Sequence, residues 1–275
     1  MSWLPGPAWL FCPADRPDRY LKALAVADIV VLDLEDAVAG SSKGLAREHV
    51  RQLVAAGSYD RDRTVLRING TASGEFAADL DVVRTLGLTR VMLAKAERAS
   101  DVESLEGLEV VALIETPAGV VAVEDIAAAT NVVAIMWGAD DLVAGLGGTS
   151  SRFADGSYRD YARYTRSRCL IAAKVYDRIA IDAVYMDIPD TAGLALQCQD
   201  AAAVGFDVTC AIHPSQIEVI RTAFTPTAEE IESAQHLIDS VGTDPGVTTH
   251  LDRMVDGPII VHALRVLRRA GRTGA

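Results

Sequence analysis

Residues 109–141 read EVVALIETPAGVVAVEDIAAATNVVAIMWGADD, and this stretch decides the fold. Its two apolar runs, Val110–Ile114 and Val132–Trp137, are short, rich in Val and Ile, and lack polar alternation, which is typical of strands buried on both faces. The segment between them is long enough for one helix, so the stretch predicts a strand–helix–strand unit with parallel strands. Both strands then end at one rim, where Glu115 and the pair Asp140–Asp141 follow them. Carboxylates gathered at one rim predict a site for a hard divalent cation such as Mg2+.

Apolar runs and amphipathic stretches alternate along most of the chain. The gaps between runs include Ala46–Ala56, Phe76–Leu86 and Tyr158–Ile179, whose composition predicts helices. Eight such units in about 250 residues favour a TIM (β/α)8 barrel over an open doubly wound sheet. The absence of a Gly-x-Gly-x-x-Gly motif and of a Walker Lys-Ser/Thr argues against nucleotide-binding folds. The predicted strands are Ala8–Cys12, Asp28–Leu34, Thr64–Ile68, Arg90–Leu93, Glu109–Ile114, Val132–Trp137, Asp182–Met186 and Phe206–Ile212.

A C-terminal helical extension, residues 226–275, is expected to follow a barrel domain of residues 1–225. Pro226–Ser240 has a helical pattern, and the polar stretch Val241–Asp252 leads to a second short helix, Pro258–Ala270. An extension of this kind is suited to cover an active site or to pack on a neighbouring subunit.

Composition excludes several classes of protein. The formal net charge of −12 argues against nucleic acid or an anionic membrane surface as the main partner. The four cysteines form no CxxC pair and no zinc-ligand spacing, which predicts free thiols in a reducing cytosol. The chain starts without a leader-like segment and contains no apolar run near the roughly 20 residues of a membrane span. We therefore expect a cytoplasmic protein without a membrane-spanning segment.

Nearly every predicted strand ends in a charged or hydrogen-bonding group, although the bodies of the strands are apolar. In TIM barrels the active site is built from the loops at the carboxyl ends of the strands. This pattern predicts a functional rim. The groups are Asp33-Leu34-Glu35-Asp36, Arg67-Ile68-Asn69, Lys95-Ala96-Glu97, Glu115-Thr116, Gly138-Ala139-Asp140-Asp141, Asp187 and His213-Pro214.

Chemistry suggests roles for some of these rim residues. Glu115 and one of Asp140 and Asp141 would hold Mg2+, and the other aspartate would cap a helix. The glycine-rich loop Gly145–Gly148 would leave the backbone N–H groups near Asp140 free to face an anion. His213, before a proline, is expected to be a turn residue rather than an acid or base.

Arg67 ends an otherwise apolar strand, and burying its guanidinium alone would be costly. It should therefore be paired with an anion. The carboxylate of a substrate is the first choice. A structural pair with Glu35 or Asp36 is the alternative.

Six short motifs lie at or near the predicted strand ends: Phe11–Ala14, Leu32–Asp36, Arg67–Asn69, Leu113–Thr116, Trp137–Leu142 and Ala211–Gln216. Together, in this order, they resemble the citrate lyase beta subunit-like family, which includes malyl-CoA and citramalyl-CoA lyases. The chain is most similar to the short stand-alone actinobacterial members. Each motif alone is weak. The resemblance covers almost the whole chain, from Trp9 to Ala270.

The resemblance implies a ligand set. Glu115 and Asp141 correspond to the Mg2+ ligands, with Mn2+ as a substitute ion, and Arg67 to the residue that binds the carboxylate of an oxo-acid. The backbone around Ala139 and Asp140 corresponds to a turn that binds a substrate oxygen. Asp140 stands where the family usually has Glu.

The resemblance also implies that Asp256 reaches a neighbouring subunit's site and takes part in proton transfer. The alternative for Asp256 is an N-cap before Pro258. Glu35 and Asp36 are added to the expected catalytic set. Ala94 replaces the family's usual proline before Lys95, so no role is assigned to that lysine.

The function implied is Mg2+-dependent cleavage of a 3-hydroxyacyl-CoA of the citramalyl-, malyl- or hydroxymethylglutaryl-CoA type to acetyl-CoA and an oxo-acid, in a homotrimer. Arg16, Arg19 and Lys22 are candidates by position for contacts with the phosphates of coenzyme A; their alternative is a solvated helix face. Three other functions stay open: an aldolase acting on free oxo-acids, a non-catalytic subunit that docks an acyl-carrier partner, and a carboxylate sensor.

Overall fold

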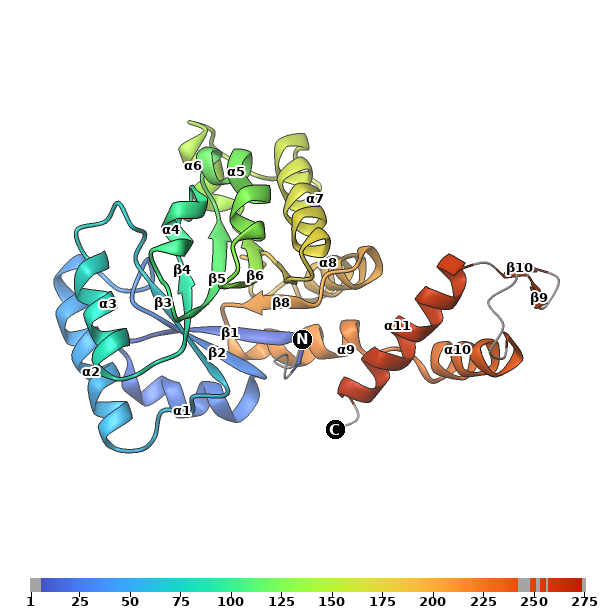
Figure 1. The fold of residues 1–275 in the computed structure, drawn as a ribbon, viewed down its shortest axis with the longest axis horizontal. Coiled ribbons are helices and arrows are strands. Elements are labelled where there is room, and N and C mark those ends of the chain that lie inside the picture. Colours follow the sequence, from blue (N-terminus) through green and yellow to red (C-terminus); the bar gives the residue numbers. More distant parts are fainter. Residues whose placement is uncertain (1–5, 242–247, 251–252, 256, 274–275) are drawn as a thin grey trace. The chain divides into compact units, whose positions relative to one another are not determined.

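The computed structural model describes residues 6–241, 248–250, 253–255 and 257–273. Its main body is a closed barrel of parallel strands in the order β1 to β8, so the predicted TIM barrel is confirmed (Figure 1). β1 pairs with both β2 and β8, which closes the barrel. The strands are β1 Ala8–Pro13, β2 Ile29–Asp33, β3 Thr64–Ile68, β4 Arg90–Leu93, β5 Glu109–Ile114, β6 Val132–Trp137, β7 Ile179–Asp182 and β8 Val208–Ala211.

Helices connect the strands and lie outside the barrel, as the strand–helix alternation of the sequence predicts (Figure 1). Two short 3-10 turns, η1 (Gly40–Ser42) and η2 (Pro214–Gln216), precede α2 and α9. The helices of this part are α1 Pro17–Val26, α2 Lys43–Ala55, α3 Phe76–Thr85, α4 Ala99–Glu103, α5 Pro117–Ala128, α6 Asp140–Gly145, α7 Asp160–Val175, α8 Thr191–Val204 and α9 Ile217–Phe224.

The barrel interior is a packed core built from alternate residues of all eight strands. Each strand sends every second side chain inward, and these side chains form one apolar cluster. On β2, β3 and β5 the next inward position after the cluster is charged: Asp33, Arg67 and Glu115. The alternation therefore places charge at the carboxyl mouth of the barrel. The cluster comprises Trp9, Ile29, Val31, Val65, Met92, Val111, Leu113, Ala134, Met136, Ile179, Ile181, Val208 and Cys210.

The seventh strand is the one predicted barrel strand that is clearly misplaced. β7 is Ile179–Asp182, whereas the prediction placed a strand at Asp182–Met186 and extended the preceding helix to Ile179. α7 ends at Val175, where Asp177 adopts a left-handed backbone conformation with φ of 53°. Glycine usually takes this position after a helix, and aspartate tolerates it. No glycine or proline marks the end of the helix, so the helical pattern of the sequence continues up to the first residue of β7.

The contacts of the chain separate two compact units, Met1–Ile220 and Arg221–Ala275. The division falls inside α9, close to the expected boundary at 225/226. In the second unit, α10 (Ala228–Val241) and α11 (Gly257–Thr273) confirm the two predicted helices. They pack through a small apolar cluster of Ala234, Leu237, Ala263 and Val266.

Two local details of the second unit bear on the predictions. Thr227 and Glu230 form a reciprocal capping box at the start of α10, with Thr227 N–H donating to Glu230 Oε2 at 2.7 Å and Glu230 N–H to Thr227 Oγ1 at 3.2 Å. Between α10 and α11 lies a two-stranded antiparallel sheet, β9 (Thr248–His250) and β10 (Arg253–Val255), which was not predicted.

All four cysteines are buried free thiols, as expected from their spacing. Among the residues that the structure describes, no helix is both long and apolar enough to cross a membrane.

Candidate active site

Arg67 forms a bidentate ion pair with Asp33 at the mouth of the barrel. Its Nε and Nη2 each donate to an Asp33 oxygen at 2.6 Å, and its Nη1 lies 3.3 Å from Glu35 Oε2. Asp33 and Arg67 are register partners on β2 and β3, so the pair follows directly from the strand alignment. The Phe11 ring lies 4.8 Å below the guanidinium. The sequence predicts that Arg67 pairs with an anion, a substrate carboxylate as the first choice and Glu35 or Asp36 as the alternative. Glu35 is in contact, whereas the main partner, Asp33, was not predicted.

Lys95 lies at the centre of the site, although no role was predicted for it. Its Nζ donates to Glu35 and to Asp36 Oδ2, the latter at 3.2 Å, and lies 3.6 Å from Asp141 Oδ1. Its backbone N–H donates to Glu115 Oε1 at 3.0 Å. Lys95 thus joins four carboxylates from three segments, those that follow β2, β5 and β6. Burial lowers the pKa of its ammonium, but the Glu35 carboxylate more than reverses this, so the pKa is raised.

Glu115 is a buried carboxyl group, only 3% exposed, directly after β5. Burial raises its pKa to about 8; Arg67 opposes the shift, and the carboxylates of Asp141 and Glu35 add to it. Gly138, at the end of β6, lies so close that a Cβ there would come 3.0 Å from Glu115 Oε2. Glycine at this position therefore leaves the Glu115 carboxylate open on the side of the β6–α6 turn.

The two aspartates after β6 both belong to the first turn of α6. Neither caps the helix, because the N-cap residue is Ala139 and no side-chain cap is present. The expectation that one of them is a helix cap is therefore wrong. The negative charges of both are favourable at a helix start, whose N–H groups have no intrahelical acceptors. Of the pair, Asp141 lies near Lys95, and burial raises the pKa of Asp140, with Arg152 opposing.

The donor set fits Mg2+. This ion is usually held by one or two carboxylates and keeps further positions for water and substrate. Glu115 and Asp141 supply two carboxylates, and the Asp141 charge lies close enough to add to the rise that burial causes in the pKa of Glu115. No group of three or more His, Cys, Asp and Glu ligands occurs in the described ranges, so the donor set does not match a closed structural metal site.

A network behind the rim holds the loop after β2. Lys43 Nζ donates to the carbonyl oxygens of Leu34 and Glu35 at 2.8 and 3.0 Å and to Asn69 Oδ1 at 3.0 Å. Asn69 in turn donates through its side chain to Asp79 at 2.6 Å. These bonds fix the backbone that carries Glu35. Lys43 was not predicted, because its distance from Glu35 in the sequence gives no signal of the contact.

Replacing Asp79 by Ala should lower the free energy of unfolding by about 2–4 kcal/mol. Asp79 is fully buried and accepts from Arg47 at 2.9 Å and from both the backbone and the side chain of Asn69, so its loss leaves two buried Asn69 donors short of an acceptor and leaves Arg47 with Glu75 alone. Urea titration would measure the change. Asp81→Ala on the same helix is the control, because the Asp81 side chain is 68% exposed. Equal losses in both variants would contradict the prediction.

The remaining predicted residues are placed as follows. His213 accepts a hydrogen bond from the Ser215 N–H and starts η2, which is the predicted turn role. Arg16 and Arg19 are exposed at the start of α1, which follows β1. Asp256 lies outside the described residues.

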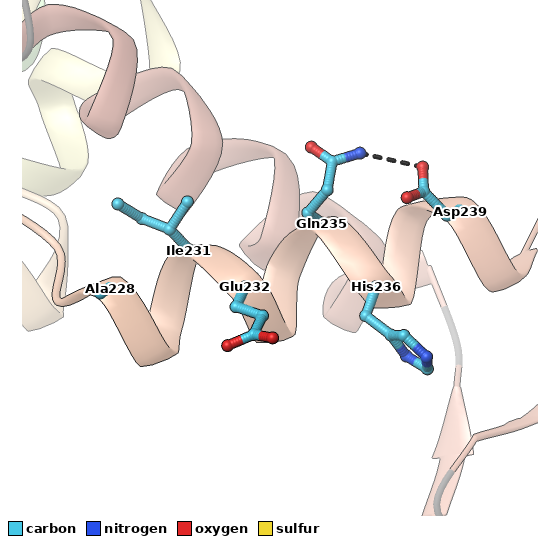
Figure 2. Close-up of a pocket in the computed structure, with 6 residues that line it drawn as sticks. All are labelled: Ala228, Ile231, Glu232, Gln235, His236 and Asp239. Atoms are coloured by element: carbon cyan, nitrogen blue, oxygen red, sulfur yellow. Dashed lines mark hydrogen bonds between the residues drawn. The ribbon is translucent and has the colours of Figure 1, made fainter.

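A shallow pocket of about 540 Å3 lies on α10 of the second unit (Figure 2). Its lining comes from that single helix, and Gln235 donates to Asp239 along it at 2.9 Å. It contains none of the strand-end groups described above. The lining residues are Ala228, Ile231, Glu232, Gln235, His236 and Asp239.

The sequence pattern of the HpcH/HpaI aldolase/citrate lyase family matches residues 8–214, which span the barrel and its rim. The chain belongs to this family. The stretch that matches includes Arg67, Lys95, Glu115 and Asp141. The resemblance noted in the sequence is thereby confirmed.

Individual relatives agree with this assignment. A citrate lyase subunit beta-like protein of Mycobacterium tuberculosis is 49% identical over 97% of this chain and 96% of its own length. The crystal structure of CitE from Mycobacterium tuberculosis with magnesium, acetoacetate and coenzyme A superposes with a TM-score of 0.91, at 49% identity, over 98% of this chain and all of the other.

Two more distant relatives, each 29% identical, carry different activities in their names. One is a mitochondrial citramalyl-CoA lyase of Rattus norvegicus, matched over 98% of this chain and 87% of its own length. The other is a (3S)-malyl-CoA thioesterase of Cereibacter sphaeroides, matched over 95% and 93%.

Proposed function

We propose that this protein is a Mg2+-dependent carbon–carbon lyase that cleaves a 3-hydroxyacyl-CoA to acetyl-CoA and an oxo-acid. The observation that carries the proposal is the arrangement of Glu115, Asp141 and Arg67 around one barrel mouth. Two carboxylates suited to Mg2+ and a guanidinium suited to a carboxylate are the groups that a chelating hydroxy- or oxo-acid requires. The Mycobacterium tuberculosis structure with magnesium, acetoacetate and coenzyme A supports the ligand classes.

Each group has a defined task in this proposal. Mg2+ held by Glu115 and Asp141 supplies fixed positive charge beside the substrate hydroxyl and a neighbouring oxygen. Arg67 binds the carboxylate of the oxo-acid portion through Nη1, since Asp33 occupies its Nε and Nη2 and Nη1 has only the longer 3.3 Å contact with Glu35 to exchange. The N–H groups at the start of α6, at Ala139 and Asp140, face the substrate oxygen.

Bond cleavage requires two proton transfers. A base takes the hydroxyl proton, the carbon–carbon bond breaks, and its electron pair passes to the thioester enolate, which is then protonated. We assign these proton transfers to Asp256, with Glu35 and Asp36 as further catalytic candidates on the rim. Asp256 belongs to the C-terminal segment, and we propose that it acts in a neighbouring subunit of a homotrimer.

Coenzyme A carries several negative phosphate charges, whereas the protein has a net charge of −12. Binding therefore requires a local group of cations. Arg16 and Arg19 are exposed, and the contact of the Arg16 side chain with Asp15 is long, at 3.9 Å. We propose that these two arginines bind the coenzyme A phosphates.

The proposal is tested by incubating citramalyl-, malyl- and hydroxymethylglutaryl-CoA with the protein, with Mg2+ or with EDTA. Acetyl-CoA, oxo-acid and free coenzyme A thiol are measured separately. A lyase forms acetyl-CoA and oxo-acid in equal amounts and only with metal. Free thiol without acetyl-CoA would indicate hydrolysis, as the name of the Cereibacter sphaeroides relative suggests for that protein. Turnover of free hydroxy-acids alone would favour the aldolase alternative, and inactivity with bound Mg2+ the non-catalytic subunit.

Mg2+ affinity should fall by about tenfold for each pH unit below about 8, because one proton must leave Glu115 when the metal binds. The sign follows from the raised pKa: below about 8 the metal-free carboxyl is neutral, and above it the carboxylate is ready to bind. The pKa of Glu115 is 4.5 in the unfolded chain and about 8 in the metal-free fold. Between pH 4.5 and about pH 8 the metal-free fold therefore becomes less stable as the pH rises, because the unfolded chain has lost this proton and the folded chain still holds it.

Titration calorimetry in buffers of different ionisation enthalpy would count the released proton. Binding that is independent of pH from 6 to 8, without proton release, would contradict the assignment of Glu115.

A further inference from the structure

The backbone that carries Lys95 is fixed in an unusual conformation. Lys95 has φ of 52°, the left-handed region that a residue with a side chain rarely adopts. Its neighbours Ala94 and Ala96 donate their N–H groups to Ile68 and Leu113 at 3.2 and 3.1 Å. These bonds hold the turn against β3 and β5.

Two glycines make room for this turn. A Cβ on Gly70 would come 2.9 Å from the Ala94 carbonyl oxygen, and one on Gly119 would come 2.4 Å from that of Ala96. Both glycines therefore allow a close backbone approach that any other residue would prevent. Strained and crowded backbone of this kind tends to be kept at functional sites. The backbone thus fixes both the position of the Lys95 Cα atom and the direction in which its side chain leaves the turn.

The fixed direction brings the Lys95 ammonium into a group of carboxylates. Glu35, Asp36 and Asp141 all contact Nζ, while the neighbouring Asp33 is neutralised by Arg67. The proposed Mg2+ ligands contact the same residue, Asp141 through Nζ and Glu115 through the backbone N–H. A permanent positive charge thus lies at the edge of the site that a divalent cation would occupy.

We propose that Lys95 is a resident counter-cation that stabilises the metal-free site and weakens Mg2+ binding. In the metal-free chain its ammonium neutralises part of the carboxylate cluster. Mg2+ must displace this ammonium from Asp141 in order to bind. Glu35 and Asp36 keep the ammonium at the rim after the metal binds. The inference rests on the proposed Mg2+ function and deepens it, because it gives the site an affinity low enough for the metal to exchange.

A merely structural role predicts the opposite sign. If Lys95 only positioned the metal ligands, its loss would misplace Asp141 and weaken Mg2+ binding. If it competes with the metal, its loss removes a repulsive charge. At an effective dielectric constant of about 20, a unit charge a few ångströms away changes the affinity of an ion by about tenfold or more.

The test is calorimetric titration of the metal-free full chain with MgCl2 at fixed pH and low ionic strength, together with thermal unfolding with and without Mg2+. The variant is Lys95→Met, which keeps the length of the stem and removes the charge. Lys174→Met is the matched control: Lys174 pairs with Asp207 at 2.5 Å, and α7 ends there at the opposite, amino-terminal side of the strands. If Lys95→Met does not fold without Mg2+, Lys95→Gln, whose amide can still donate to Glu35, is tested in its place.

The expected result is a Kd for Mg2+ about tenfold lower than in the wild type, with a lower melting temperature of the metal-free variant and a larger rise when Mg2+ is added. Lys174→Met should keep the wild-type Kd. An unchanged or higher Kd in the Lys95 variant, while the wild type binds Mg2+, overturns this inference alone. A wild type that binds no Mg2+ overturns the proposed metal site and this inference with it.

Discussion

Replacing Glu115 by Gln should abolish Mg2+-dependent turnover, lowering kcat by about 10^3-fold or more, because metal stabilisation of developing charge is worth several kcal/mol. The fold should survive. Burial already favours the neutral form of Glu115, and Gln resembles that form and can still accept from the Lys95 N–H. Asp141→Asn should have a similar effect on turnover.

Calorimetry should show weakened Mg2+ binding, while circular dichroism should match the wild type. Glu109→Gln is the control on the same strand, since Glu109 begins β5 at the opposite end from Glu115 and pairs with Arg90. Near wild-type turnover in either Glu115→Gln or Asp141→Asn would remove that residue from the metal site.

Replacing Arg67 by Met should have two separable effects. The free energy of unfolding should fall by about 3–5 kcal/mol, because fully buried Asp33 loses its cation. In the protein that remains folded, kcat/KM should fall by about 10^2- to 10^3-fold, because a charge-assisted contact to the substrate carboxylate is lost.

A double variant separates the two effects. Adding Asp33→Asn to Arg67→Met removes the unpaired buried charge and should recover much of the lost stability without recovering kcat/KM. Stability would be followed by urea unfolding and activity in the lyase assay at a temperature where both variants are folded. Recovery of activity together with stability would show that Arg67 acts only through its ion pair with Asp33.

The barrel could be predicted from the sequence because each of its strands is a short apolar run that must be buried on both faces. Seven of these runs contain or overlap the observed strands closely, and the eighth shares only Asp182 with β7. That error arose where Asp177 ends α7 without a glycine, in a left-handed conformation held by local hydrogen bonds. The unpredicted sheet pairs β9, in the polar stretch, with β10 directly after it, and neither three-residue segment carries a strand pattern.

The sequence predicted which residues lie on the rim, but only part of how they contact one another. The predicted carboxylates each contact or face Arg67 or Lys95; they are Glu35, Asp36, Glu115 and Asp141. The partner of Arg67 could have been found from the sequence. The inward alternation of β2 and β3 places Asp33 beside it.

By itself, the sequence determined that this chain folds as a parallel barrel with a charged carboxyl mouth, because apolar runs and strand alternation act over a few neighbouring residues. Only the tertiary structure decided how those charges are shared. Lys95 became central because a backbone turn, fixed by contacts with Gly70 and Gly119, points its ammonium at carboxylates from two other loops. The raised pKa of Glu115 has the same origin, since burial depends on the whole closed barrel rather than on the residues next to it in the chain.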